Sequence, residues 1–441
     1  MPSCVELHTF EEIRRRMDEA PVSRAQLMAI ASIFALSTVD GYDVLSVTFV
    51  APALGAAWSV GMASLGIVLS SGLVGMALGS FLLAPLADLW GRKPTILGGL
   101  VLLVAGMFLS AFAHSVPQLV SWRLLTGLGI GASIAVINSL AAELTNARWR
   151  PLAFAVMALG FPIGGAVGGV VAAALLRSHA WPAVFMAGSL STALLIPLMA
   201  LVLPEPLAYL VLRKSPDRME RVNALLVRFG HPPVADVPVP PTNKRGYALV
   251  FAAGQIGTTL WVVLVQVLFV LAIYFVLTWL PQMVAQAGFS LSTGSVASAV
   301  ANLAGVGGGL LLGAVTKTSN VEAFTASSMI CFGVAIAGLG VTPPLLMPFM
   351  IAASVCGFFL YGSAAGFYAT LAVSFAAEAR ASGSGLVLGV GRIASAIAPL
   401  AAGRLFAAGL GRTEVSAIFC LCAIAAGIVL LLHSRRAVPV L

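Results

Sequence analysis

The sequence of 441 residues is poor in charged side chains. Asp, Glu, Lys and Arg make up 9% of it, hydrophobic residues make up 60%, and the mean hydropathy is +1.02. A water-soluble globular protein carries about 25% charged residues, so the composition excludes that class and predicts a chain that crosses a membrane several times. The net charge of +8 does not indicate a nucleic-acid partner, because the basic residues lie in short segments between apolar runs. The lipid bilayer is the expected surrounding.

Cysteine and histidine are also scarce, with five of each. The pair Cys420 and Cys422 has neither zinc nor redox spacing, and no Ser/His/Asp grouping is evident. We therefore expect no metal site, no cofactor and no enzymatic activity. Residues 1–26 lack the pattern of a secretory signal, so the first apolar run is expected to remain in the mature protein.

Twelve apolar runs are long enough to span a bilayer, which takes about 20 residues each. The sequence predicts an all-α polytopic membrane protein, with twelve transmembrane helices in two six-helix bundles. The predicted segments are an N-terminal segment at 1–26, a first bundle at 27–203, a linker at 204–247, a second bundle at 248–433 and a tail at 434–441. The predicted spans are 27–51, 62–83, 95–113, 119–142, 152–175, 182–203, 258–281, 290–314, 323–341, 345–374, 382–406 and 413–433. Thr9 and Glu12 fit a capping box and predict a short amphipathic helix over 10–19.

Of the 24 Lys and Arg residues, Arg177 and Arg412 fall on one side of this topology, Arg123, Arg392 and Arg404 fall inside spans, and all the others fall on the opposite side. By the positive-inside rule, both termini and the linker are expected in the cytoplasm, with the protein in the inner (cytoplasmic) membrane. Two repeated halves around a central loop are typical of secondary transporters, whose substrate site lies between the halves near mid-membrane. Such a fold needs no second copy, so we expect a functional monomer.

Four charged residues lie well inside the predicted spans, namely Asp40, Asp43, Arg123 and Arg392, whereas Arg404 lies near the end of its span. A charge in a bilayer costs several kcal/mol, so such residues usually face a water-filled path or a partner. Asp40 and Asp43 are three residues apart and share a helix face, and Asp40 lies at a depth where Arg123 would pair with it. We predict that Asp40, Asp43 and Arg123 couple proton movement, with either Asp40 or Asp43 as the proton carrier. The alternative is a purely structural ion pair.

The segment Gly79–Pro94 resembles the loop signature of the major facilitator superfamily between the second and third spans. Ala84 and Leu89 depart from the pattern, standing where glycine and arginine are usual. Acidic and basic residues after the fourth span look like its companions, and Gly313–Asn320 in the second half lacks the aspartate. The resemblance implies a cytoplasmic gate in the first half, formed by Asp88, Gly91, Arg92, Lys93, Glu143 and Arg150.

Further segments resemble the aromatic acid:proton symporter family, of the 4-hydroxybenzoate and benzoate transporter type. They are Asp40–Asp43, Arg123–Gly129, Leu203–Pro206, Tyr274–Pro281 and Gly389–Ile393. The resemblance implies a proton-coupled importer of a small aromatic carboxylate, with that acid and protons as its partners.

Substrate contacts are expected from one cation and several aromatic or amide side chains. The planar guanidinium of Arg392, near the middle of the second half, suits a carboxylate. Tyr42, Tyr274, Trp279 and Tyr361 are able to stack on a benzene ring, and Asn138 and Asn302 to bond ring hydroxyls. The alternative is that the aromatic residues face lipid or the core and that the amides bond neighbouring helices.

Two other functions fit the same sequence. The segment Gly160–Gly165 is close to a signature of antiporters, which would make the protein a proton-driven exporter of drugs or organic anions. A membrane sensor that binds the ligand without moving it is the second alternative. The polar linker is short and Pro-rich, which disfavours a signalling domain.

Overall fold

The structure, a computed structural model, describes residues 9–83, 85–213, 215–238, 250–251, 256–315, 320–375 and 379–434. The predicted tail beyond residue 434, residues 316–319 of the segment Gly313–Asn320, residues 239–247 of the linker and residues 248–249 of the second bundle lie outside this range, as does Ala84. The helices are α1 (Phe10–Glu19), α2 (Arg24–Trp58), α3 (Met62–Leu82), α4 (Leu86–Trp90), α5 (Arg92–Ala111), α6 (Val116–Leu144), α7 (Arg150–Ser178), α8 (Pro182–Val202), α9 (Leu207–Leu212), α10 (Arg218–Arg228), α12 (Ile256–Gln286), α13 (Leu291–Val315), α14 (Val321–Val341), α15 (Leu346–Ser374), α16 (Arg380–Ala407) and α17 (Arg412–Ser434).

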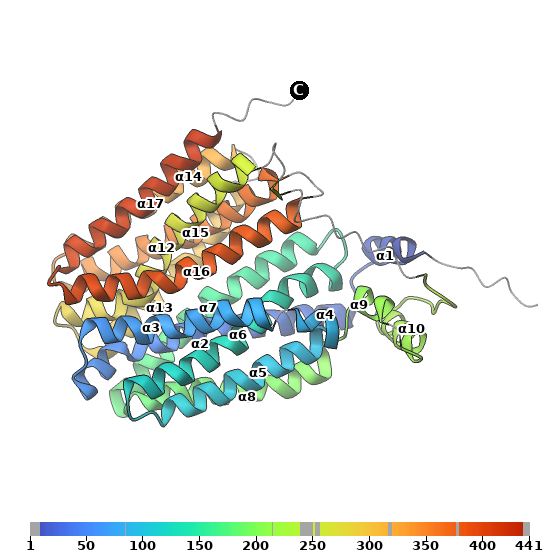
Figure 1. The fold of residues 1–441 in the computed structure, drawn as a ribbon, viewed down its shortest axis with the longest axis horizontal. Coiled ribbons are helices and arrows are strands. Elements are labelled where there is room, and N and C mark those ends of the chain that lie inside the picture. The colour runs from blue at the N-terminus through green and yellow to red at the C-terminus, as the bar shows by residue number, and fades with distance from the viewer. Residues whose placement is uncertain are drawn as a thin grey trace, which may run out of the picture.

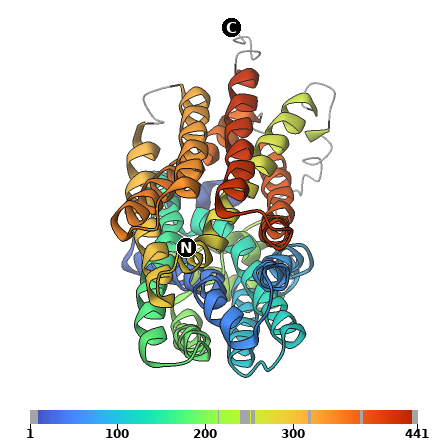
Figure 2. The ribbon, with the colours of Figure 1, turned by 90° about the vertical axis from the view of Figure 1, so that its left-hand side faces the viewer.

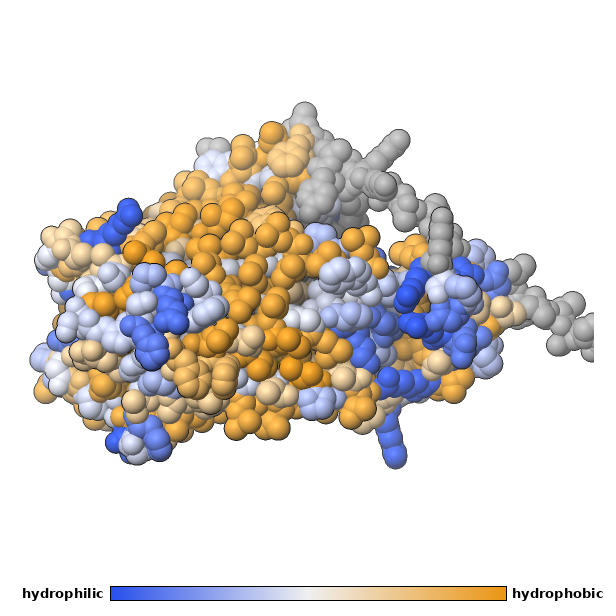
Figure 3. Space-filling model, turned by 60° about the horizontal axis from the view of Figure 1, so that its bottom comes forward, coloured by the Kyte–Doolittle hydropathy of each residue, from blue (hydrophilic) through white to orange (hydrophobic). Residues whose placement is uncertain are grey.

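Each predicted span corresponds to one long helix. Among the described residues, eleven helices are long and apolar enough to cross a membrane, and α6, with 29 residues, packs among them as the twelfth. Figure 3 shows a broad hydrophobic band across the middle of the face in view, with hydrophilic side chains gathered toward its two ends. The predicted all-α membrane fold is confirmed.

The long helices form two bundles, one from each half of the chain. Figure 2 shows them stacked, with α2, α3 and α5 to α8 in the first bundle and α12 to α17 in the second. The bundles meet where α3 packs on α16, α7 on α13, and α2 on both α12 and α13. The short helices α1, α4, α9 and α10 all lie at one end, called the linker end below (Figure 1).

The predicted amphipathic helix over 10–19 is confirmed as α1. The Thr9 hydroxyl accepts the backbone N–H of Glu12, and the Glu12 carboxylate accepts that of Thr9, so two donors at the helix start are satisfied. Ile13 and Met17, one turn apart, are buried in a core formed with the first bundle, the linker helices and the segment after α10. The helix is therefore held against the bundle.

Glycines allow α2 and α7 to approach at backbone distance. An ideal Cβ on Gly164 would lie 1.8 Å from the carbonyl oxygen of Thr38, and one on Gly41 would lie 2.2 Å from that of Phe161. Gly160 likewise packs on Ser37. The segment Gly160–Gly165, which suggested an exporter, thus has a packing role against α2.

The two bundles are in closest contact at the end opposite the linker end. There, an ideal Cβ on Gly66 of α3 would lie 2.9 Å from the carbonyl oxygen of Pro399, and one on Gly169 of α7 would lie 2.6 Å from that of Ser295. Toward the linker end the approaches are wider. The nearest atom to a Cβ on Gly389 is Cζ of Phe81 at 3.7 Å, and Phe81 is exposed. The opposite end is therefore the more tightly closed.

We predict that Gly164→Ala destabilises the protein, because the added methyl group would overlap the Thr38 carbonyl and push α2 from α7. Overpacking of this kind costs about 1–3 kcal/mol. The measurement is the melting temperature of the purified protein in detergent. Gly98→Ala is the matched control, since nothing lies within 4 Å of that position. Equal melting temperatures for the two variants would contradict the packing described here.

Candidate functional site

Asp40 and Asp43 are buried on α2, with relative exposures of 2% and 0%. One oxygen of Asp43 accepts a hydrogen bond of 3.0 Å from the Thr192 hydroxyl of α8. Among the described residues, no donor reaches the other oxygen of Asp43 or either oxygen of Asp40. Since burying an ionised carboxylate without partners is strongly unfavourable, both residues depend on a proton or a nearby positive charge.

Arg123 is buried in the first bundle but does not pair with Asp40, so that expectation is wrong. Its Nη2 donates to the main-chain oxygen of Asp43 at 3.0 Å, and its Nη1 lies 3.1 Å from Sδ of Met107. The guanidinium also lies over the Phe185 ring, 5.5 Å from its centroid. Depth explains the difference. From the linker end, Arg123 is about 31 Å along its helix, Asp43 about 28 Å and Asp40 about 24 Å.

Arg392 of α16 is half-buried and acts electrostatically on Asp40 of α2 and on Tyr274 of α12. Arg392 lies about 18 Å along α16 from the linker end, compared with about 24 Å along α2 for Asp40. The carboxylate of Asp40 in the first bundle and the guanidinium of Arg392 in the second therefore interact electrostatically across the contact between the bundles.

Tyr361 and Asn302 form a hydrogen-bonded pair at about the depth of Arg392. The Tyr361 hydroxyl donates to Oδ1 of Asn302 at 2.5 Å, and the Asn302 amide donates to the main-chain oxygen of Ser298 at 2.8 Å. Both side chains line a small cavity between α12, α13 and α15. An ideal Cβ on Gly165 of α7 would lie 2.7 Å from Asn302 Oδ1, so the pair lies where the bundles meet.

Four of the predicted substrate residues thus form a polar row across the second bundle. Arg392 acts electrostatically on Tyr274, and Tyr274 on Tyr361, so the row runs from α16 through α12 to α15 and α13. Its cation lies at one end, and the Tyr361–Asn302 pair at the other. The members of the row are Arg392, Tyr274, Tyr361 and Asn302.

The structure places the other predicted substrate residues apart from this row. The Tyr42 hydroxyl donates to the main-chain oxygen of Val184 at 2.7 Å, inside the first bundle. Trp279 is fully buried, donates from Nε1 to the oxygen of Pro399 at 3.2 Å, and packs on Phe406. The side chain of Asn138 lies outside the described residues.

Three of the predicted gate residues, Gly91, Arg92 and Lys93, contact a carboxylate that the sequence analysis did not include in the gate. The backbone N–H groups of Arg92 and Lys93, at the start of α5, each donate to Glu205 at 3.0 Å. Burial raises the pKa of the Glu205 carboxyl, and these two hydrogen bonds partly oppose the rise. Gly91 has φ of +112°, and a Cβ there would lie 2.4 Å from Glu205 Oε1. Both observations explain a glycine at this position. In the sequence, Glu205 lies in the segment Leu203–Pro206, and the resemblance of that segment to the symporter family was the one indication of its importance.

The side chains of the gate bond within the first half of the chain. Arg92 lies 3.5 Å from Asp88 and 3.8 Å from Glu143, while Nζ of Lys93 donates to the main-chain oxygen of Ala200. Asp88 is 80% exposed, so its pair with Arg92 contributes little to stability. Within the described ranges, none of the gate ion pairs reaches the second bundle.

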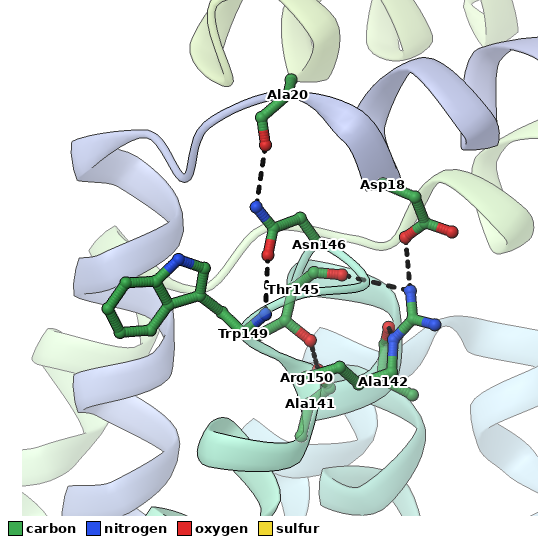
Figure 4. Close-up of polar contacts among 8 residues, drawn as sticks. All are labelled: Asp18, Ala20, Ala141, Ala142, Thr145, Asn146, Trp149 and Arg150. Carbon is green, nitrogen blue, oxygen red and sulfur yellow. Dashed lines mark hydrogen bonds and ion pairs between the residues drawn. The ribbon is translucent and has the colours of Figure 1, made fainter.

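Arg150 is held by α1, a contact the sequence did not predict. Its Nη2 lies 2.5 Å from Asp18, and its Nε donates to the oxygen of Ala142 at 3.0 Å. Figure 4 shows a second tie beside it, in which the Asn146 amide donates to the main-chain oxygen of Ala20 at 2.8 Å. These bonds fasten α1 to the loop between α6 and α7.

We predict that Glu205→Ala lowers the melting temperature, because two N–H groups at the start of α5 lose their acceptor. A partly buried donor left unsatisfied costs about 1–3 kcal/mol. Glu220→Ala, at an exposed position of α10, is the matched control and should melt like wild type. The interpretation is wrong if both variants melt at the wild-type temperature.

We predict that Asp18→Asn loosens α1, because the Arg150 ion pair loses its charge. Trypsin should then cut at Arg14, Arg15 or Arg16 several-fold faster than in wild type, since a local opening exposes the backbone. Glu19→Gln is the control, because it removes a charge from the same helix. The Glu19 carboxylate is exposed, and its ion pair with Arg15 is long, at 3.9 Å. Equal cleavage rates in the two variants would show that Asp18 does not anchor α1.

Comparison with known proteins agrees with this architecture. Residues 28–399 match the model of the Major Facilitator Superfamily. The chain is 29% identical to a gallate transporter of Pseudomonas putida, over 97% of each chain. It is 28% identical to a 4-hydroxybenzoate transporter of Acinetobacter baylyi, over 85% of this chain and 84% of the relative.

Solved structures show the same fold at lower identity. The xylose transporter XylE from E. coli, in a partially occluded inward open conformation, has a TM-score of 0.73 at 15% identity, over 95% of this chain and 98% of its own. A bacterial homolog of the human lysosomal transporter Spinster has a TM-score of 0.72 at 14% identity, over 94% and 98%. From the match over residues 28–399, the chain belongs to the Major Facilitator Superfamily and is a multi-pass membrane transporter.

Proposed function

We propose that the protein imports a small aromatic carboxylate by alternating access, coupled to proton entry. The observation that carries the proposal is the electrostatic interaction between Asp40 of the first bundle and Arg392 of the second. The named activities of the gallate and 4-hydroxybenzoate transporters support the substrate class. The substrate passes through unchanged, so the cycle needs neither a cofactor nor a metal.

The proposed coupling is a competition for Arg392. When Asp40 is ionised, it attracts the guanidinium, because no hydrogen-bond donor among the described residues reaches either Asp40 oxygen and Arg392 is the cation that acts on it. When Asp40 is protonated, the guanidinium is free to bind the substrate carboxylate, for which its planar fork is suited. A bound anion thus requires a bound proton, which is symport. The polar row would place the ring beside Tyr274 and direct its far edge to the Tyr361–Asn302 pair.

The direction of transport follows from the proposed orientation. The Lys and Arg bias places the linker end and both termini in the cytoplasm, in the inner membrane of the cell. The structure is then the inward-facing state, with closely packed bundles on the outside and the gate residues bonded within the first half. Closing the gate would bring these residues to the second bundle. The site is built from one chain, so we propose a monomer.

The test is uptake of radiolabelled 4-hydroxybenzoate, gallate and benzoate into proteoliposomes, with an inward proton gradient and with an uncoupler. We expect accumulation that the uncoupler abolishes. Arg392→Ala should reduce it more than tenfold, whereas Arg404→Ala, an exposed arginine on the same helix, should not. Asp40→Asn should lose accumulation but keep exchange of labelled for unlabelled substrate, because its amide cannot carry the proton.

Two results would contradict the proposal. If the gradient expels these acids from preloaded vesicles, the protein is an exporter. If the protein binds an aromatic acid saturably without any flux, it is a sensor.

A further inference from the structure

The α8 helix is shaped around Asp43. Gly188 of α8 leaves room for the carboxylate, because an ideal Cβ there would lie 2.8 Å from Asp43 Oδ1 and 2.8 Å from the Tyr42 ring. One turn later, the Thr192 hydroxyl donates to Asp43 Oδ2 at 3.0 Å. Among the described residues, Thr192 is the one side chain that donates a hydrogen bond to this carboxylate. Asp43 Oδ1 accepts no hydrogen bond from these residues, and Arg123 donates to the main-chain oxygen of Asp43.

The Thr192 hydroxyl has two acceptors and one hydrogen. It lies 3.0 Å from Asp43 Oδ2 and 2.9 Å from the main-chain oxygen of Gly188. While Asp43 is ionised, the hydrogen stabilises the carboxylate. When Asp43 binds a proton, its O–H donates to the Thr192 oxygen, and the Thr192 hydrogen turns to Gly188. Both arrangements keep α2 bonded to α8.

The charged and titratable groups acting on Asp43 are few. Asp40 and Tyr42 lie on its own helix and Arg123 on α6. The other helices around the carboxylate, α5 and α8, present Met107, Gly188 and Thr192, which do not titrate. Removing the Thr192 hydroxyl therefore changes one interaction of the carboxylate and none of these charges.

We propose that Thr192 is a positioning residue of proton coupling, whose hydroxyl holds ionised Asp43 and reverses its hydrogen bond when Asp43 is protonated. The role in transport rests on the proton coupling proposed above. It gives Asp43 a task distinct from that of Asp40. Asp40 interacts electrostatically with Arg392 of the second bundle. Asp43 instead changes its hydrogen bond with Thr192 of α8, inside the first bundle, when it gains or loses a proton.

The first readout is an infrared titration of the Asp43 carboxyl, with its band assigned by its loss in Asp43→Asn. In Thr192→Val the ionised form has lost its donor, so the midpoint of the band should move to higher pH by about one unit. Thr192→Ser keeps the hydroxyl and should titrate like wild type. Thr126→Val is the control, because Thr126 is buried and bonds the main-chain oxygen of Trp122 in its own helix. If Thr192→Val does not fold, Thr192→Ala removes the hydroxyl without adding volume.

The second readout is the pH dependence of 4-hydroxybenzoate uptake by the same proteins. Its midpoint should follow the infrared midpoint, while the KM of substrate exchange stays near the wild-type value. An infrared midpoint that is the same in Thr192→Val and Thr192→Ser overturns the inference, whatever the uptake shows. If the infrared midpoint moves but wild type shows no gradient-driven uptake, the hydrogen-bond reversal stands and the proposed function fails.

Discussion

The structure depends on the burial of charges that do not neutralise one another. Asp40, Asp43 and Arg123 are all nearly inaccessible, yet no ion pair joins them within the described residues. A fully satisfied buried pair is locked, because breaking it leaves a bare charge in an apolar interior. Here Arg123 donates to a main-chain oxygen and a thioether, while its Nε and three of the four carboxylate oxygens have no partner among the described residues. Their protonation is therefore able to change without breaking a salt bridge.

Close helix packing makes this arrangement possible. The Thr192 hydroxyl reaches the buried carboxylate of Asp43 because no side chain stands between α2 and α8 there, and Gly188 provides that opening. On its other side, α2 rests on α7 through Gly164, so that its position is fixed from two directions. In a membrane, where the hydrophobic effect does not drive helices together, such small-residue contacts are what brings helices together.

The sequence predicted the elements better than the contacts between them. Span lengths follow from bilayer thickness, so the twelve helices were readable, as were the unusual charges inside them. The depth of each residue along its helix and the rotation of that helix decide which charged side chains come into contact. Arg123 therefore reached the main chain of Asp43 and not Asp40, while Tyr361 and Asn302 met as neighbours. Thr192 carried no signal, because hydroxyl residues are common in spans, and Asp18 acquires its role only from the fold around Arg150.

One continuous helix, α2, connects the linker end to the buried carboxylates Asp40 and Asp43. The α2 helix begins four residues after Ala20, which Asn146 holds, and continues without interruption to Asp40 and Asp43. The gate carboxylate Glu205 and the cation Arg92 belong to the same half. In the proposed cycle, a change at Asp40 would reach the predicted gate by rotation of the whole first bundle, because a closely packed bundle resists internal deformation. The glycine-lined contact around Gly66 and Pro399, where the two bundles approach closely, would then serve as the pivot.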